Sequence, residues 1–515
     1  MLPEFVNTTF TDFSKDDNRK AMLTALDRVE KQFGRVYPIV LGGEEIVTDD
    51  RIKSLNPSKY DEVVGFFSKG NVAHAEKAIA IADETFTWWR NVPPDERSRY
   101  LLRAAAIMKR RRLDLAAWMV FEVGKNWAEA DGDVAEAIDF LEFYAREMIR
   151  YGSPQPVTAY PGEENELYYI PLGVGAVIPP WNFPLAILVG MTSAAIVAGN
   201  TVVLKPASVS PAIAYQFFEI MREAGLPDGV LNFLVGSGGQ IGDPIVQHPR
   251  TRFIAFTGSK EIGLRIHELA SKPSPGQIWI KRTVLEMGGK DFILVDSSAD
   301  VDAAAEGIVT AAYGFQGQKC SACSRAILHQ DIYDAVIERM LERVKKITIG
   351  PTKDQANYLG PVVDEPAFNK ILEYIEIGKK EGKLAAGGGK GPAGGYFIQP
   401  TVIKDIKENA RIAQEEIFGP VLAVIKAKDF EHGIAIANGT EFGLTGALYS
   451  NDRSHLEFGR RELHCGNLYL NRKCTGALVG AQPFGGFNMS GTDSKAGGRD
   501  YLALFTQGKS VSERF

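Results

Sequence analysis

Residues 173–205 read GVGAVIPPWNFPLAILVGMTSAAIVAGNTVVLK, and this stretch decides the fold. The apolar run up to Pro179 predicts a buried strand, and Pro184 falls near the first turn of a helix that ends at about Val197. The end of the stretch predicts a second strand. No charged residue precedes Lys205 here, as in a membrane span, but the prolines interrupt any continuous spanning helix. A buried strand–turn–helix–strand unit therefore explains the pattern better.

Further strand and helix patterns alternate after this stretch. Residues 211–223 predict a helix, and 230–235 and 252–256 predict strands. A second series begins with a strand at 292–295 and an alanine-rich helix over 300–313. Repeated units of this kind predict parallel sheets that are covered by helices on both faces, so we expect a doubly wound α/β architecture.

Two other regions have distinct compositions. The chain before residue 150 has mostly helical patterns, and 151–169 is rich in proline, glycine and tyrosine, which predicts a protruding hairpin or arm. The glycine-rich segment 385–395 predicts a surface loop. It is not a phosphate-binding P-loop, because Lys390 is followed by Gly391 where serine or threonine is needed.

Composition limits the class of protein and its partners. The 515 residues are 45% apolar and 24% charged, which predicts a folded protein of two or three domains. The net charge of −6 argues against nucleic acid or membrane as a partner, and we interpret the basic run 109–112 as a solvated helix face. Four cysteines cannot form a disulfide framework, and residues 1–20 lack an apolar leader core. We therefore expect a cytoplasmic location.

Cys320 is the strongest candidate for a nucleophile. It follows Gly314 and Gly317, which let the backbone take an unusual path after a helix. The alternative is a small buried apolar side chain. Cys320 and Cys323 also match the C-x-x-C pattern of redox and metal sites, although His464 and the other cysteines supply no matching second pair. We expect no metal, and a dithiol redox or metal-binding protein is the rival class.

Two polar residues stand at the ends of predicted apolar elements. Glu286 ends a strand directly before a Met and two glycines, where a carboxylate can activate water; the ordinary alternative is a surface or capping glutamate. Asn182 stands on a stiff turn at a helix start, which suits a donor to an oxyanion; the alternative is ordinary N-capping.

The signals for a nucleotide are indirect. The segment 236–242 misses the dinucleotide fingerprint G-x-G-x-x-G by one residue. Residues 256–259 end a strand and open a helix, whose free N–H groups and dipole can receive phosphate. Lys205 ends another strand, at the edge where such folds bind nucleotides.

Seven motifs resemble those of the aldehyde dehydrogenase superfamily and occur in its order. They are PWNFP (180–184), KPA (205–207), FTGS (256–259), LEMGGK (285–290), GQKC (317–320), EEIFGP (415–420) and PFGG (483–486). The resemblance implies two doubly wound parallel-sheet domains and a small β arm for oligomerisation. Its implied boundaries are 1–150 and 172–285 for the NAD-binding domain, 286–482 for the catalytic domain, and 151–171 and 492–515 for the arm.

The resemblance also implies roles for individual residues. Cys320 matches the nucleophile, Glu286 the general base and Asn182 the side-chain half of the oxyanion hole, whose other half is the Cys320 backbone N–H. The implied contacts to NAD are made by Trp181, Lys205, Ser208, Gly238, Thr257, Gly258, Ser259, Glu416 and Phe418. Strict NAD enzymes of the family have glutamate at the position of Ser208, so we expect NAD to be preferred and NADP tolerated.

Within the superfamily, the chain is most similar to the 1-pyrroline-5-carboxylate dehydrogenases, which oxidise glutamate γ-semialdehyde. This likeness rests on Ser321 and the segment 471–477, and it implies that Ser321, Gly476 and Ala477 bind the substrate α-carboxylate while Phe183 and Phe484 enclose its aliphatic chain. The alternative substrate is another semialdehyde, of succinate or aminoadipate. The arm implies a homodimer or a higher homo-oligomer.

Overall fold

The first sheet of the computed structural model, which describes residues 2–515, is built on the uncharged stretch. Its order is β11-β10-β7-β8-β9-β2-β3, parallel except for β2 and β3. The strands are β2 (Ile39–Leu41), β3 (Glu44–Ile46), β7 (Val174–Ile178), β8 (Thr201–Leu204), β9 (Leu231–Phe233), β10 (Thr251–Thr257) and β11 (Arg282–Glu286). The connecting helices are α6 (Ala186–Val197), α7 (Pro211–Glu223), α8 (Asp243–Gln247) and α9 (Lys260–Ser271), with a π-helical turn, η1, at Gly238–Gly242.

The second sheet has the order β14-β15-β16-β13-β12-β18-β19 and is parallel except at β14. Its strands are β12 (Phe292–Val295), β13 (Arg325–His329), β14 (Lys383–Ala386), β15 (Thr401–Ile406), β16 (Val421–Ala427), β18 (Thr445–Tyr449) and β19 (Asn467–Leu470). The helices are α10 (Val301–Tyr313), α11 (Tyr333–Val344), α12 (Glu365–Glu381), α13 (Arg411–Gln414), α14 (Phe430–Asn438) and α15 (Arg453–Glu462). Two 3₁₀ turns, η2 (Gly314–Gly317) and η3 (Gln330–Ile332), and the pair β17 (Phe442–Gly443) and β20 (Phe487–Asn488) complete this part.

The N-terminal part is helical, as expected, but it also contains strands that the sequence did not reveal. Its helices are α1 (Asp16–Glu30), α2 (Val72–Trp89), α3 (Pro94–Arg110), α4 (Arg112–Val123) and α5 (Trp127–Tyr151), and its further strands are β1 (Arg35–Tyr37), β4 (Arg51–Leu55) and β5 (Val63–Ser68). The strands β1, β4 and β5 form a separate sheet, and β2 and β3 extend the first sheet. The strands β1, β2 and β3 have only three residues each, too few for an alternating pattern to be recognised locally.

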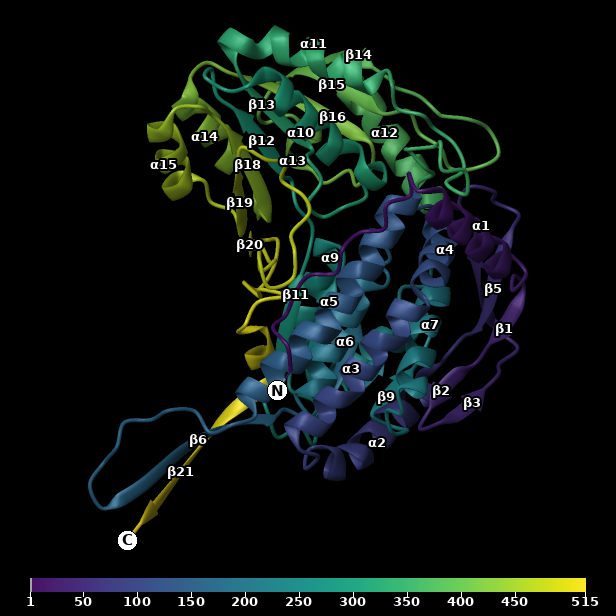
Figure 1. The fold of residues 1–515 in the computed structure, drawn as a ribbon, viewed down its shortest axis with the longest axis vertical. Coiled ribbons are helices and arrows are strands. Elements are labelled where there is room, and N and C mark those ends of the chain that lie inside the picture. Colours follow the sequence, from purple (N-terminus) through teal and green to yellow (C-terminus); the bar gives the residue numbers. More distant parts are fainter. Residues whose placement is uncertain (1) are drawn as a thin grey trace.

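A two-stranded ribbon projects from the body of the protein (Figure 1). It consists of β6 (Glu163–Pro171) and β21 (Thr506–Arg514), paired antiparallel over their whole lengths. The expected arm is therefore present, but its main partner strand comes from the C-terminal end and not from a local hairpin. The 3₁₀ turn η4 (Tyr501–Phe505) directly precedes β21 and packs in the protein core.

The uncharged stretch is buried in the core and does not form a membrane helix. Its helix, α6, has only 12 residues and is buried on all sides, against α5 and α3 among others. Among residues 2–515, no helix combines the length and the apolar character that crossing a membrane requires.

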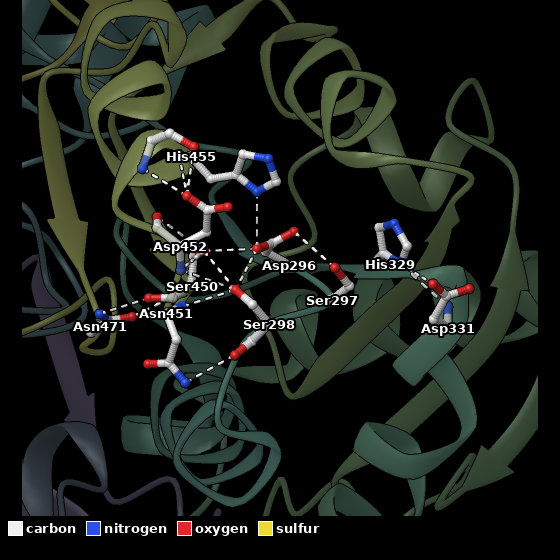
Figure 2. A network of polar contacts seen from close by, with 11 residues as sticks. Asp296, Ser297, Ser298, His329, Asp331, Ser450, Asn451, Asp452, His455 and Asn471 are labelled. Carbon is white, nitrogen blue, oxygen red and sulfur yellow. Dashed lines mark hydrogen bonds and ion pairs between the residues drawn. The ribbon is translucent and has the colours of Figure 1, made fainter.

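A polar network closes the carboxyl edge of the second sheet (Figure 2). Asp296 follows β12, and its Oδ2 accepts hydrogen bonds of 2.7 Å from the hydroxyls of both Ser298 and Ser450. His455 Nδ1 lies 3.1 Å from the same oxygen. These hydrogen bonds and the nearby imidazole outweigh the burial that opposes ionisation, and they lower the pKa of Asp296 to about 2.

Replacing Asp296 by asparagine should destabilise the protein by roughly 2 kcal/mol at neutral pH, because charge-assisted hydrogen bonds are lost. The native pKa of about 2 is lower than the unfolded value of about 3.9, so the stabilisation is complete above about pH 5 and decreases as the pH falls toward 2. Urea unfolding of wild type and Asp296→Asn at pH 7 and pH 3 measures this difference, because most of the loss occurs below pH 4. An equal or larger difference at pH 3 would contradict the assignment.

Candidate active site

A cleft of about 590 Å³ lies where the two sheet domains meet. Residues from both domains line it, including Asn182 and Cys320. All the predicted cofactor residues except Ser208 are in its walls: Trp181, Lys205, Gly238, Thr257, Gly258, Ser259, Glu416 and Phe418. The sequence did not identify its apolar side chains, which include Ile178, Val246, Ile262, Ile266 and Ile417.

The first sheet contributes groups that suit an anionic nucleotide. Lys205 directly follows β8, and burial lowers the pKa of its ammonium to about 8. Ser259 is the N-cap of α9, and its hydroxyl accepts a hydrogen bond of 3.4 Å from the Ile262 N–H. The preceding Gly258 has no room for a side chain, since a Cβ atom would lie 2.5 Å from the ring of Phe256. The backbone at this helix start can therefore approach a ligand closely.

The second domain closes the opposite wall through the loop before β16. Phe418 has a left-handed backbone, with φ of 61°, and its ring makes an edge contact with Trp181 at 5.5 Å. The Glu416 carboxylate accepts a hydrogen bond of 3.0 Å from the Gly289 N–H. Burial raises the pKa of Glu416. This hydrogen bond links the LEMGGK and EEIFGP motifs.

The loop before Cys320 has an unusual backbone path. After α10, Phe315 and Gln316 adopt left-handed conformations, with φ of 48° and 58°. The Gln316 side-chain amide donates to the carbonyl oxygens of Gly124, at 3.1 Å, and Pro361, at 2.8 Å. These bonds stabilise a conformation that non-glycine residues rarely adopt.

The Cys320 thiol lies among carboxylates. Burial and the nearby carboxylates of Asp291, Glu416 and Glu286 raise its pKa well above the ordinary value. Lys319, the adjacent cation, does not compensate, because its ammonium pairs with Glu129 at 2.7 Å. These surroundings favour the uncharged thiol, so thiolate formation needs a compensating cationic or hydrogen-bonding group beside the sulfur.

Asn182 and Glu286 lie close to the loop that carries Cys320. Asn182 is buried, and its Nδ2 donates a hydrogen bond of 3.1 Å to the carbonyl oxygen of Gln318. The Glu286 carboxylate accepts hydrogen bonds from the Ser494 hydroxyl and from the Gly486 N–H, the latter at 3.3 Å. Burial nevertheless raises the pKa of Glu286 to about 8.

The residues predicted to bind substrate lie outside the lining of the cofactor cleft. Ser321 is buried, and its carbonyl oxygen lies 3.4 Å from the thiol of Cys474. Gly476 forms a turn with φ of 81°, and Arg472 donates hydrogen bonds to the carbonyls of Thr475 and Gly476 at 2.8 and 3.0 Å. Contacts of Ala477, Phe183 and Phe484 with a substrate stay predictions.

A buried ion pair next to the Phe183 ring was not predicted from the sequence. Lys125 is fully buried, with its ammonium 2.9 Å from the Asp133 carboxylate. It also lies over two aromatic rings, 4.2 Å from the centre of Phe183 and 4.5 Å from that of Phe315. Lys125 therefore supports both the turn that carries Asn182 and the loop that leads to the nucleophile.

The C-x-x-C alternative receives no support from the geometry. Cys323 is buried, and its thiol faces the carbonyl oxygen of Arg325 at 3.6 Å. All four cysteines are free, and within residues 2–515 no three metal-binding side chains gather in one place. The two cysteines of the C-x-x-C spacing lie in the segment between η2 and the start of β13.

Comparison with known proteins agrees with this arrangement. The family model of the aldehyde dehydrogenase family matches residues 46–511. The chain belongs to the aldehyde dehydrogenase family. Two relatives named 1-pyrroline-5-carboxylate dehydrogenase, from Geobacillus sp. (strain WCH70) and Bacillus cytotoxicus, are 57% and 55% identical, and each match covers both chains completely.

Solved structures of aldehyde dehydrogenases share this fold. The structure of 1-pyrroline-5-carboxylate dehydrogenase from Thermus with bound NAD has a TM-score of 0.98 and 54% identity, with both chains fully covered. Betaine aldehyde dehydrogenase from Staphylococcus aureus, in complex with NAD⁺, has a TM-score of 0.89 and 28% identity over 96% of this chain and 97% of that one. The expected family, enzyme class and fold class are confirmed.

Replacing Lys125 by methionine should destabilise this aldehyde dehydrogenase by about 3–5 kcal/mol, because the buried Asp133 carboxylate loses its cation. The double variant Lys125→Met/Asp133→Asn removes both charges and should recover at least half of that loss. Urea unfolding monitored by tryptophan fluorescence compares the three proteins. A double variant that is no more stable than the single one would contradict the ion-pair account.

Proposed function

We propose that this enzyme oxidises L-glutamate γ-semialdehyde, formed from 1-pyrroline-5-carboxylate, to L-glutamate in proline and arginine catabolism, with NAD as hydride acceptor. The observation that carries the proposal is a cysteine thiol and an amide donor, Cys320 and Asn182, in one cleft with a helix N-terminus and a buried lysine. Full-length relatives at 55–57% identity named 1-pyrroline-5-carboxylate dehydrogenase support the substrate.

The cleft residues fit a dinucleotide. The Lys205 ammonium has lost much of its hydration through burial, and hydroxyl groups of a ribose would replace it. The backbone N–H groups at the start of α9 suit a pyrophosphate, and the Glu416 carboxylate suits the second ribose. Ser208 carries no charge that would select against a 2′-phosphate, so NADP should be tolerated. A bound nicotinamide supplies the acceptor for the hydride that leaves the substrate carbon.

Cys320 performs the covalent step. Its thiol releases its proton to water, and the sulfur attacks the aldehyde carbon, which gives a tetrahedral adduct with a negatively charged oxygen. One N–H of the Asn182 amide already donates to Gln318, and its second N–H, with the Cys320 backbone N–H, donates to that oxygen. Loss of hydride from the adduct leaves a thioester on the sulfur.

Glu286 performs the hydrolytic step. Its carboxylate takes a proton from water, the resulting hydroxide attacks the thioester carbon, and the carbon–sulfur bond breaks. The acid leaves, and the Cys320 thiolate is regenerated. The α-carboxylate of the substrate is held by Ser321 and by the Gly476–Ala477 turn, which Arg472 braces, while Phe183 and Phe484 enclose the aliphatic chain.

The decisive assay follows NAD reduction with glutamate semialdehyde in wild type and in Cys320→Ala. Wild type should turn over, and the variant should lose at least about 10³-fold in kcat because the covalent step is removed. Ser321→Ala should mainly raise KM for glutamate semialdehyde, by roughly tenfold for one hydrogen bond to a charged group.

Two comparisons complete this assay. Succinate and aminoadipate semialdehydes serve as competing substrates, and a higher kcat/KM for either would overturn the proposed substrate. Cys323→Ala is the matched cysteine control. Near-normal activity supports the dehydrogenase, and complete loss would favour the dithiol protein, which needs both thiols.

We further propose that the enzyme is a homodimer or a higher homo-oligomer in the cytoplasm, with the arm at the subunit interface. The projecting ribbon and the segment before β6 carry apolar side chains exposed to solvent, such as Val511 on the ribbon and Val157 and Tyr160 before it, which a second copy would cover. The four free cysteines fit a reducing compartment. We also propose that residues 1–150 and 172–285 form the NAD-binding domain, 286–482 the catalytic domain, and 151–171 and 492–515 the arm.

Removing residues 507–515 should convert the oligomer to monomers, because β6 loses its partner strand and the ribbon cannot form. Light scattering coupled to size exclusion measures the mass at one protein concentration for both forms. Circular dichroism checks that the body of the protein is still folded. An unchanged oligomeric mass in a folded variant would exclude the arm from the interface.

A further inference from the structure

The C-terminal segment 490–496 packs along the strand that ends in Glu286. The Met287 N–H donates to the Ser490 carbonyl at 2.7 Å, and the Thr492 N–H donates to the Leu285 carbonyl at 3.0 Å. The segment then pairs with the PFGG turn, where the N–H groups of Phe484 and Ala496 each donate to the other's carbonyl at 2.8 Å. Backbone hydrogen bonds on both sides of Ser494 therefore fix its position.

Ser494 directs its hydroxyl at the Glu286 carboxylate. The side chain is 2% exposed, and its Oγ donates to Oε1 of Glu286. The other carboxylate oxygen, Oε2, accepts from the Gly486 N–H at 3.3 Å. A Cβ atom on Gly485 would lie 2.9 Å from Oε1 and 1.5 Å from the Ser494 carbonyl oxygen, so only glycine allows this approach. The carboxylate is thus held by one donor on each oxygen.

The Lys495 side chain also stabilises the PFGG turn. Its ammonium donates to the carbonyls of Gly485, at 2.6 Å, and Gly466, at 2.7 Å. These bonds connect the turn that supplies the Gly486 N–H to the start of β19. Lys495 also lies close enough to Glu286 to favour the ionised carboxylate.

We propose that Ser494 is a positioning residue for the general base, and that its hydroxyl orients the Glu286 carboxylate and favours its ionised, water-activating form. The inference rests on the proposed function, in which Glu286 activates the water that hydrolyses the thioester. The hydroxyl acts through Glu286 and touches neither the substrate nor the cofactor. Its contribution therefore falls on the hydrolytic step, and the covalent attack by Cys320 does not depend on it.

The sign of the effect follows from the groups around Glu286. Burial and the charge of Asp493 raise the pKa of Glu286, whereas the hydrogen bonds from Ser494 and Gly486 and the charge of Lys495 lower it. The net result is a pKa of about 8. Cys320 and Tyr501 are the other titratable groups that the carboxylate influences, and both are neutral until their raised pKa values are reached. Losing the hydroxyl removes a stabilising contact to the charged form, so the pKa of Glu286 rises further.

The test compares Ser494→Ala with Thr492→Val and Ser494→Thr. Thr492 is the matched control, since its hydroxyl lies on the same segment but accepts from the Leu285 backbone N–H, at 3.0 Å, and does not contact the carboxylate. Ser494→Thr keeps the hydroxyl and should restore the wild-type profile. Each protein is assayed with NAD and glutamate semialdehyde from pH 6 to pH 10, in the steady state and in the first turnover.

In Ser494→Ala, the midpoint of the rising limb of the kcat–pH profile should shift upward by about one pH unit. The value of kcat should therefore fall roughly tenfold at pH 7 and recover at high pH. The first turnover should keep its rate and show a larger burst of NADH, because only hydrolysis is slowed. Thr492→Val should keep the wild-type midpoint, although its thermal stability falls.

A loss in Ser494→Ala that is the same at every pH, or a midpoint that Thr492→Val shifts equally, overturns the inference and leaves a structural role. The failure of the proposed function is recognised separately. Wild type would then show no NAD reduction, or Glu286→Gln would turn over at the wild-type rate. If wild type turns over and Glu286→Gln is inactive in hydrolysis, an unshifted Ser494→Ala profile rejects this inference alone.

Discussion

The position of Cys320 depends on the side-chain hydrogen bonds that hold its loop in a left-handed path. The Gln316 amide bridges the carbonyls of Gly124 and Pro361, and Gln318 Oε1 accepts from the Val363 N–H at 2.9 Å. These contacts tie the loop after α10 both to the helical N-terminal part and to the segment before α12. They stabilise a backbone conformation that non-glycine residues rarely adopt.

Burial is the second constraint, because it favours the uncharged form of each reactive group. It raises the pKa of the Cys320 thiol and of Glu286, and it lowers the pKa of Lys205. Each group thus needs a charged or polar neighbour to carry its charge, and a ligand in the cleft supplies several such neighbours at once. Lys125 and Asp133 differ, because each already has the other as its counter-ion.

The two doubly wound sheets use their carboxyl edges differently. In the first sheet, the ends of β8 and β10 open into the cleft through Lys205 and the FTGS turn. In the second sheet, the corresponding edge at β12 and β18 is filled by its own side chains, with Asp296, Ser298, Ser450 and His455 bonded together (Figure 2). The topological position that binds ligands in such sheets is therefore available in the first sheet and closed in the second.

The sequence by itself determined the α/β class, the order of the strand–helix units after residue 173 and the motifs that identify the family. These features are local, since a buried strand, a helix start or a glycine turn is encoded within a few neighbouring residues. The long strand β10 and the helices α7 and α10 lie within a residue or so of their expected bounds for this reason.

Only the tertiary structure decided which distant segments meet. The short strands β1 to β5, the pairing of β6 with β21, the Lys125–Asp133 pair and the Ser494 contact to Glu286 each join residues whose own neighbours give no sign of the partner. Their stability comes from burial and hydrogen bonding across the folded chain, and no pattern within a short window of sequence carries that information.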